Sequence, residues 1–139
     1  MTKDLQNRWA DKIKFSYRHF PLIGLVGHER SPVAAEAAEC AYEQDKFWPY
    51  HDLLFANQPA FSQESLLRYS NQLQLNETEF KLCLASRVKA QVVKTDREEG
   101  LSKKVDATPT FFLNGEVVGD WRTLPQLVAE KLGEKLPIQ

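Results

Sequence analysis

Two cysteines and three histidines are the residues of this sequence best suited to nucleophilic, redox or metal chemistry. Cys40 and Cys83 lie far apart and form no CxxC motif, and they have no Cys/His spacing typical of a zinc site. His19, His28 and His51 are scattered along the chain, so each is expected to be a structural or surface residue rather than a ligand. We therefore expect no metal ion and no cofactor.

One histidine has an acidic neighbour that suggests an acid–base pair. His51 is followed directly by Asp52. Because consecutive side chains of a helix point in different directions, we expect these two not to act together.

A stretch near the C-terminus, Val105–Gly119 (VDATPTFFLNGEVVG), is the other candidate for function. Its Asn-Gly dipeptide favours a type I′ turn, which predicts a hairpin with strands at Thr110–Leu113 and Glu116–Val118. Pro109 cannot donate to a sheet ladder, so it is expected just before the first strand. The residues alone leave two interpretations open, a rigid loop that faces a substrate and a plain strand start.

The elements around this stretch follow from hydrophobic spacing and capping residues. Ile13–Tyr17 alternates apolar and polar residues and predicts a strand, and Leu22–Arg30 predicts a loop. The apolar run Phe111–Leu113 is typical of a strand covered on both faces. Helices are expected at Thr2–Ala10, from Ser31 to Gln44, over Asp45–Asn57, after Ser62, after Asn76, from Ser86 towards Lys104, and after Thr123. This order predicts an α/β fold with helices packed on a sheet.

Bulk properties narrow the class of protein. The chain has 139 residues and a net charge of −1, which predicts one domain, residues 1–139, and no nucleic-acid partner. No apolar run approaches the roughly 20 residues that span a bilayer, so no membrane insertion is expected. The first residues lack the apolar core of a signal peptide, which predicts the cytoplasm for the chain as written.

Several segments together resemble the DsbA-like thiol–disulfide oxidoreductases of the thioredoxin superfamily. The matching segments are KFSYRHFPL (Lys14–Leu22), AAEAAECAYEQDKFWPYHDLLF (Ala34–Phe55) and ATPTFFLNG (Ala107–Gly115). The resemblance covers nearly the whole chain, from Lys12 to Leu132. It implies a thioredoxin-like fold with a helical insertion at about residues 31–104.

The resemblance also implies a role for the Thr-Pro step. It makes Pro109 the family's cis-proline, and Thr108 before it would offer backbone groups to an extended peptide or protein substrate. Such recognition adds a strand to the sheet, with main-chain hydrogen bonds supplying most of the affinity.

The chain departs from the family at its reactive centre. In the family, the first strand and a CxxC at a helix N-terminus lie upstream of the helix that matches Thr2–Ala10, and the printed chain starts inside that helix. Without a thiolate at that place, thiol–disulfide exchange in the family's manner has no nucleophile. Three explanations are open: a truncated or mis-started gene product, direct pairing of Ile13–Tyr17 with the hairpin, or a homodimer that completes the sheet.

Three interpretations of the two cysteines are open. Some family members carry a second, structural disulfide in the helical insertion, which implies a possible Cys40–Cys83 bridge. Two reduced, buried thiols are the expectation that we prefer for a reducing compartment, and a redox role is the third.

The leading hypothesis is thus a DsbA-like, thioredoxin-fold protein that is redox-inactive as this chain. A second is the C-terminal part of an active disulfide oxidoreductase whose CxxC lies upstream, in which case the protein would be periplasmic or exported. A third is a peptide-binding or transporter-associated domain, because similar DsbA-like domains are fused to sodium/proton antiporters. Whether the protein is an enzyme therefore stays open.

Overall fold

The computed structural model describes residues 2–135 and divides the chain into two compact units. One unit combines the residues up to Tyr17 with those from Val105 onwards, and the other is Arg18–Lys104. The second unit ends where the helical insertion is expected to end and begins earlier than expected. The two units are described separately.

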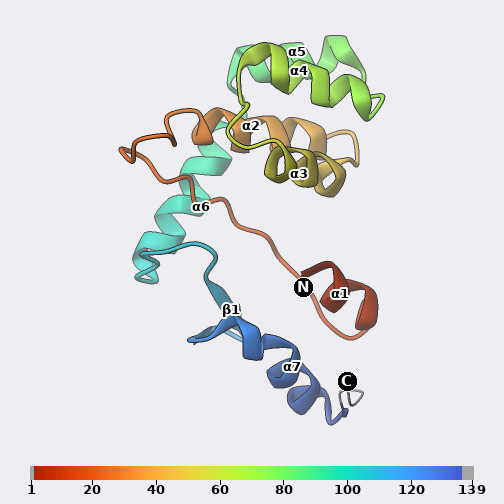
Figure 1. Cartoon of the computed structure of the whole chain (residues 1–139), viewed down its shortest axis with the longest axis vertical. Coiled ribbons are helices and arrows are strands. Elements are labelled where there is room, and N and C mark those ends of the chain that lie inside the picture. The colour runs from red at the N-terminus through yellow and green to blue at the C-terminus, as the bar shows by residue number, and fades with distance from the viewer. Residues whose placement is uncertain (1, 136–139) are drawn as a thin grey trace. The chain divides into compact units, whose positions relative to one another are not determined.

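The Arg18–Lys104 unit is helical (Figure 1). Its helices are α2 (Ser31–Tyr42), α3 (Phe47–Ala56), α4 (Gln63–Gln72), α5 (Glu77–Ser86) and α6 (Ala90–Ser102). Two of them begin with the expected caps, since Ser62 and Asn76 accept hydrogen bonds from the backbone N–H groups of Ser65 and Glu79. The predicted cap at Ser86 is wrong. That residue closes α5, and Arg87 follows in the left-handed conformation before α6 begins.

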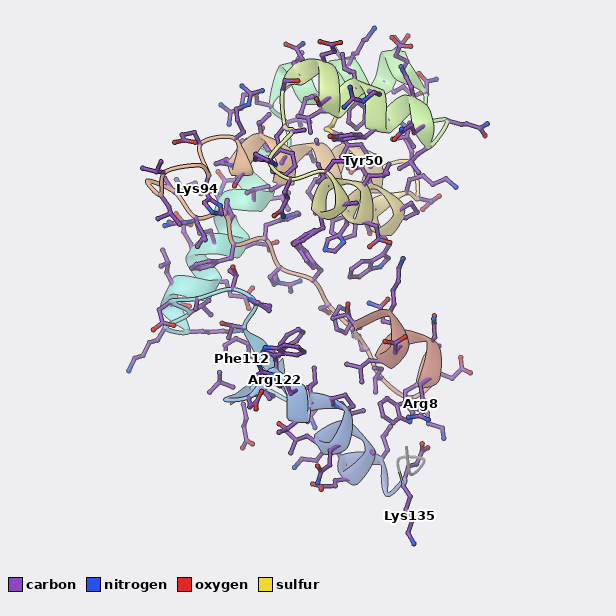
Figure 2. All side chains as sticks on the ribbon, in the orientation of Figure 1. Arg8, Tyr50, Lys94, Phe112, Arg122 and Lys135 are labelled. Carbon is purple, nitrogen blue, oxygen red and sulfur yellow. A yellow bond between two sulfur atoms is a disulfide. The ribbon has the colours of Figure 1, made fainter. Side chains whose placement is uncertain are left out.

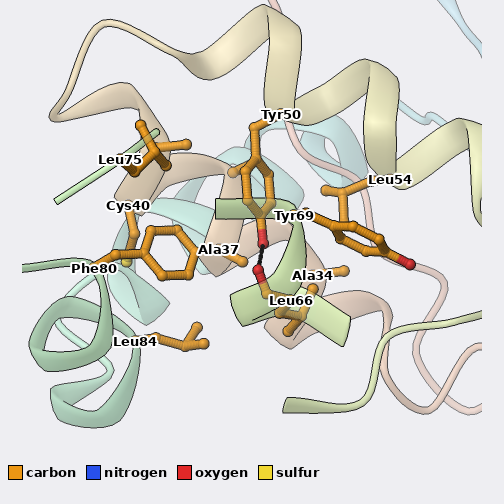
Figure 3. Close-up of a cluster of buried hydrophobic side chains, with 12 residues drawn as sticks. Ala34, Ala37, Cys40, Tyr50, Leu54, Leu66, Tyr69, Leu75, Phe80 and Leu84 are labelled. Atoms are coloured by element: carbon orange, nitrogen blue, oxygen red, sulfur yellow. Dashed lines mark hydrogen bonds between the residues drawn. The ribbon is translucent and has the colours of Figure 1, made fainter. Parts of the chain in front are cut away.

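The helical unit has its own apolar core, built between α2, α3, α4 and α5 (Figure 3). Alanines on α2 allow close approach, and the aromatic ring of Tyr50 lies between Tyr69 and Phe80 at centroid distances of 6.4 and 5.4 Å. The Tyr50 hydroxyl donates to the backbone oxygen of Leu66 at 2.8 Å, so the buried phenol is satisfied. Burial raises the pKa of Tyr50 and keeps the phenol neutral.

The other unit carries the hairpin and the terminal helices. Its elements are α1 (Thr2–Arg8), β1 (Phe111–Leu113), β2 (Glu116–Val118), the 3₁₀ turn η1 (Trp121–Thr123) and α7 (Leu124–Leu132). A small core joins both helices and the hairpin. It is formed by Leu5 of α1, by Trp9 directly after α1 and by residues of α7, with hairpin side chains packed against it. The sheet among the described residues is the antiparallel pair β1–β2.

The predicted strand at Ile13–Tyr17 is wrong. The segment has no ladder partner in the two-stranded sheet of the described residues, so its pairing with the hairpin is not present either. Its side chains nevertheless alternate between half-buried and exposed, as the sequence pattern indicates. Alternation therefore reported the burial of every second side chain, whereas a strand also requires a neighbour to complete its hydrogen bonds.

Three aromatic side chains are more exposed than the sequence suggested. Phe112, at the centre of the apolar run, is 37% exposed, so β1 is not covered on both faces. Phe55 and Trp121, whose large aromatic side chains favour a place in or near the core, are 59% and 40% exposed.

Candidate functional site

The Thr-Pro step lies in a short loop directly before β1. The Thr108–Pro109 peptide bond is cis, and Ala107, Thr108 and Pro109 are all exposed. The Thr110 hydroxyl donates to the backbone oxygen of Ala107 at 2.6 Å and closes the loop around the step. Sequence reasoning missed this bond, although a threonine three residues after a loop carbonyl is a common way to satisfy such an oxygen.

The hairpin that follows has the predicted turn. Asn114 and Gly115 have φ angles of 51° and 87°, as a type I′ turn requires at both central positions. The register pairs Phe111 with Val118 and Leu113 with Glu116. The strand bounds agree with the prediction to within one residue at the start of β1.

The backbone groups of Thr108 make no hydrogen bond within the described chain. Among residues 2–135, no hydrogen bond of the protein uses the Thr108 N–H or C=O, and the residue is exposed. An exposed, unpaired amide just ahead of a strand can extend that strand's ladder to a second chain. The site is therefore a short backbone edge with a fixed loop beside it.

The hairpin rests on a packed platform. Phe111, Leu113 and Val118 pack against the core of α1 and α7. Trp9 in that core donates from Nε1 to Glu134 Oε2 at 2.7 Å. Glu134 also forms an ion pair with Lys12, and these two hydrogen bonds lower its pKa.

The structure joins the two cysteines. Cys40 on α2 and Cys83 on α5 form a disulfide with Cα atoms 5.9 Å apart, so the preferred expectation of two reduced thiols is wrong. One helical turn away on the same two segments, Arg87 binds the buried carboxylate of Glu36 through two hydrogen bonds of 2.6 and 3.1 Å. Those hydrogen bonds raise the pKa of Arg87. Both links hold α5 against α2.

The histidines occupy separate polar contacts. His19 is buried and its Nε2 lies 2.8 Å from Glu39 Oε1. His51 Nδ1 lies 3.3 Å from Asp52 Oδ1, so the expectation that these neighbours point apart is wrong. No cluster of three or more His, Cys, Asp or Glu side chains within residues 2–135 is arranged to hold a metal ion.

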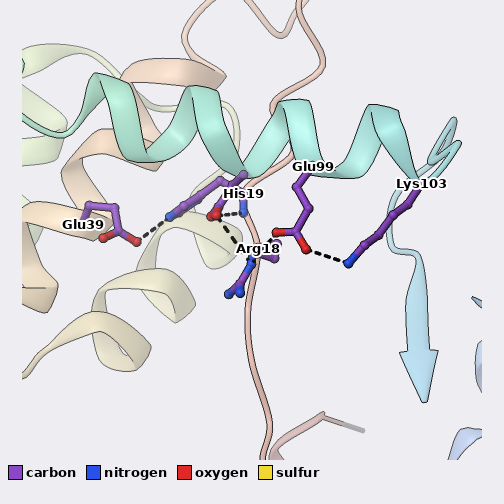
Figure 4. Close-up of polar contacts among 6 residues, drawn as sticks. Arg18, His19, Glu39, Glu99 and Lys103 are labelled. Carbon is purple, nitrogen blue, oxygen red and sulfur yellow. Dashed lines mark hydrogen bonds and ion pairs between the residues drawn. The ribbon is translucent and has the colours of Figure 1, made fainter. Parts of the chain in front are cut away.

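The segment around His19 is held to α6 by charged groups (Figure 4). Arg18 Nε donates to Glu99 Oε2 at 3.0 Å, and Lys103 Nζ donates to the other oxygen at 2.6 Å. The Lys103 bond first, and then the Arg18 bond, lower the pKa of Glu99. The His19 backbone N–H donates to Asp96 at 3.0 Å. These contacts position the chain segment around His19 against α6.

The comparison with family models decides the assignment. The model described as Thioredoxin matches residues 2–129, which include both the Thr-Pro hairpin and the helical unit. The chain belongs to the DsbA-like family of the thioredoxin superfamily. The fold is accordingly thioredoxin-like, α/β, with a helical insertion.

Curated relatives of this DsbA-like chain are named as transporters. The chain is 41% identical over 103 residues to Na(+)/H(+) antiporter NhaA 3 of Salinispora tropica, covering 74% of the chain and 16% of that protein. It is 34% identical over 112 residues to Na(+)/H(+) antiporter NhaA of Herminiimonas arsenicoxydans, covering 81% and 17%. The chain thus spans about a sixth of the length of these relatives.

Two further findings concern solved structures and membrane-spanning helices. No solved structure matches the chain. Of the helices formed by residues 2–135, none is long and apolar enough to cross a membrane.

Proposed function

We propose that this DsbA-like domain binds extended polypeptide segments at the Thr108–Pro109 loop and performs no thiol–disulfide exchange by itself. The observation that carries the proposal is the exposed Thr108 backbone, whose N–H and C=O no described residue engages. A bound peptide would satisfy both groups and lie beside β1 as an added strand.

The fixed loop favours such binding. The Thr110–Ala107 hydrogen bond and the packing of the hairpin on α1 and α7 order the loop before a ligand arrives. A preordered edge loses less conformational entropy on binding than a flexible one. The peptide gains affinity from backbone hydrogen bonds, so the site should tolerate many sequences.

The state of the cysteines argues against exchange by this chain. Disulfide exchange requires an attacking thiolate. The two cysteines of the sequence are bonded to each other, and Cys40 is 1% exposed. Neither sulfur is therefore a free nucleophile, and burial shields the Cys40 sulfur from attack by a substrate thiolate.

Two measurements test the proposal. Alkylated insulin B chain, an extended peptide with blocked thiols, is titrated into isotopically labelled protein, and backbone NMR shifts are followed. We expect changes concentrated at Ala107–Phe111, with no insulin-reducing turnover above background. Changes confined to the helical unit, or none at all, would refute peptide binding at the loop. Turnover that disappears in Cys40→Ala or Cys83→Ala would refute redox inactivity.

A second candidate function follows from the names of the relatives. We propose that the domain works attached to, or beside, a sodium/proton antiporter, as the transporter-associated hypothesis expects. Translating the genomic DNA on both sides of the coding region tests this. An antiporter frame joined to the domain supports it, and a frame upstream that adds a strand and a CxxC supports an active oxidoreductase instead.

The edge of β1 also bears on assembly. We propose a homodimer as the alternative means of completing the two-stranded sheet. Size-exclusion chromatography with light scattering distinguishes a homodimer from a monomer, and a monomer at high concentration would refute the dimer.

The disulfide supports an exported location. Structural disulfides persist in oxidising compartments and are rare in the cytosol, so we propose that the domain works outside the cytoplasm. Thiol labelling of the protein trapped directly from cells tests this, because a cytosolic pool would carry two reactive cysteines.

A further inference from the structure

The loop between the His19 segment and α2 presents aliphatic side chains to solvent. Ile23, Leu25 and Val26 are 62%, 52% and 90% exposed, within a run of consecutive exposed residues. Figure 1 shows this segment leaving the helices of its unit as a projecting loop. Single exposed aliphatic residues are common on protein surfaces, whereas three within four positions of one loop are unusual.

The tip of the loop is an ordered turn. The His28 N–H donates to the Leu25 oxygen at 3.0 Å, and Gly27 has a φ of 86° at the third position of that turn. The Gly27 N–H donates to the Glu29 carboxylate at 3.1 Å. Val26 therefore occupies the corner of the turn and cannot fold back without breaking these bonds.

The turn is open around its two glycines. A side-chain carbon placed on Gly24 or Gly27 would meet no atom of the described chain within 4 Å. The aliphatic side chains thus form a protrusion, which suits insertion into a yielding apolar medium.

Arginines hold the base of the loop. Arg97 of α6 donates from Nε to the Pro21 oxygen at 3.2 Å, and Arg30 donates from Nε to the Phe61 oxygen at 3.0 Å. Lys94, labelled in Figure 2, lies one turn before Arg97 on α6, with its side chain 66% exposed. The remaining guanidinium N–H groups and the ammonium are suited to phosphate oxygens.

Two carboxylates moderate this charge. Glu29 is engaged by the loop backbone, which lowers its pKa, and Glu98 lies 3.8 Å from Lys94. The positive excess at the base is therefore small, and apolar insertion must supply most of any affinity.

We propose that Ile23, Leu25 and Val26 insert into the surface of a lipid bilayer, with Arg30 and Arg97 at the level of the phosphate groups. Fluid acyl chains accommodate a projecting tip, whereas a protein partner would need a matching pocket. Full burial of each such side chain raises the partition coefficient from water into the bilayer roughly tenfold or more. Three partly inserted side chains contribute less than one acyl anchor, so the binding is reversible. This inference goes beyond the proposed function and does not depend on it.

Vesicle flotation with the full chain tests the inference. The probes are vesicles of phosphatidylcholine alone and of phosphatidylcholine mixed with phosphatidylglycerol. We expect the chain to float with both, a few-fold more with the anionic vesicles. In the triple variant Ile23→Ser, Leu25→Ser, Val26→Ser, the partition coefficient into the vesicles should fall at least about a hundredfold.

A matched control separates the loop from exposed apolar surface in general. The variant Leu82→Ser, Val88→Ser removes two aliphatic side chains of similar exposure, 69% and 62%, and should float like the wild type. Val26→Asp alone provides a second loop variant with a smaller change in the chain. Absence of flotation by the wild type, or flotation of the triple variant, would overturn the proposal. So would self-association that the triple variant abolishes in light scattering, because the loop would then contact protein.

Discussion

The Thr110 hydroxyl donates to the Ala107 carbonyl oxygen at 2.6 Å, across the exposed Thr108–Pro109 step. This bond is the polar link that holds both ends of the loop together before β1 begins. The residue that precedes the strand thus fixes the backbone that we propose as the peptide-binding edge.

Replacing this hydroxyl should weaken peptide binding. Thr110→Val keeps the side-chain shape and removes a bond worth about 1 kcal/mol, so affinity for alkylated insulin B chain should fall about fivefold. The NMR titration measures it. Thr123→Val is the matched control, because Thr123 makes the same kind of bond, at 2.7 Å, to the Asp120 oxygen. Equal loss in both variants would contradict a specific role for Thr110.

The disulfide should contribute much of the stability of the helical unit. It closes a loop with a sequence separation of 43, which corresponds to about 4 kcal/mol of unfolding free energy. Urea unfolding of the Cys40→Ala, Cys83→Ala variant should show that loss. Added reductant should lower the unfolding free energy of the wild type and leave that of the variant unchanged. Two labelled thiols in air-purified protein, seen by mass measurement, would contradict the bridge.

The hairpin could be predicted from sequence because its determinants are local. Asn114 and Gly115 tolerate the required φ angles, and the apolar residues on either side need only pair with each other. The caps at Ser62 and Asn76 are equally local. The assignment to a family also came from short segments, which the match over residues 2–129 confirms.

Features that depend on distant partners were missed. The strand expected at Ile13–Tyr17 has the right alternation and lacks a ladder neighbour among the described residues. Phe55 has the more apolar side chain, yet Tyr50 is the fully buried ring of α3, and the Leu66 oxygen satisfies its hydroxyl. Cysteine type alone could not show that Cys40 and Cys83 face each other.

Loss of the Arg87–Glu36 pair should destabilise the helical unit. Glu36 is 2% exposed, so Arg87→Met leaves a buried carboxylate without its charged partner, at a cost of about 2 kcal/mol in urea unfolding. The double variant Glu36→Leu, Arg87→Leu should recover part of this loss. Lys81→Met, which removes an exposed ion pair with Glu77, should change stability by less than about 0.5 kcal/mol. An Arg87→Met variant as stable as the Lys81→Met control would contradict the role of the pair.

Glu134 should make the stability of the hairpin unit depend on pH. Hydrogen bonds from Lys12 and then from Trp9 lower its pKa in the folded state below the value of 4.5 expected when unfolded. The carboxylate therefore contributes stability above about pH 4.5, and this contribution is lost as pH falls through the lower, folded-state pKa.

Urea unfolding of the wild type and of Glu134→Gln, compared across pH, measures this contribution. The difference in unfolding free energy should be largest near neutral pH and should disappear in acid, because a protonated Glu134 resembles the glutamine. Lys12→Met should remove the larger part of the pH dependence that Glu134 gives to the unfolding free energy. The hydrogen bond from Lys12 is the first cause of the lowered Glu134 pKa, and the bond from Trp9 remains in this variant. A difference that stays constant from neutral pH into acid would show that the carboxylate charge does not stabilise the contact between Trp9 and the end of α7.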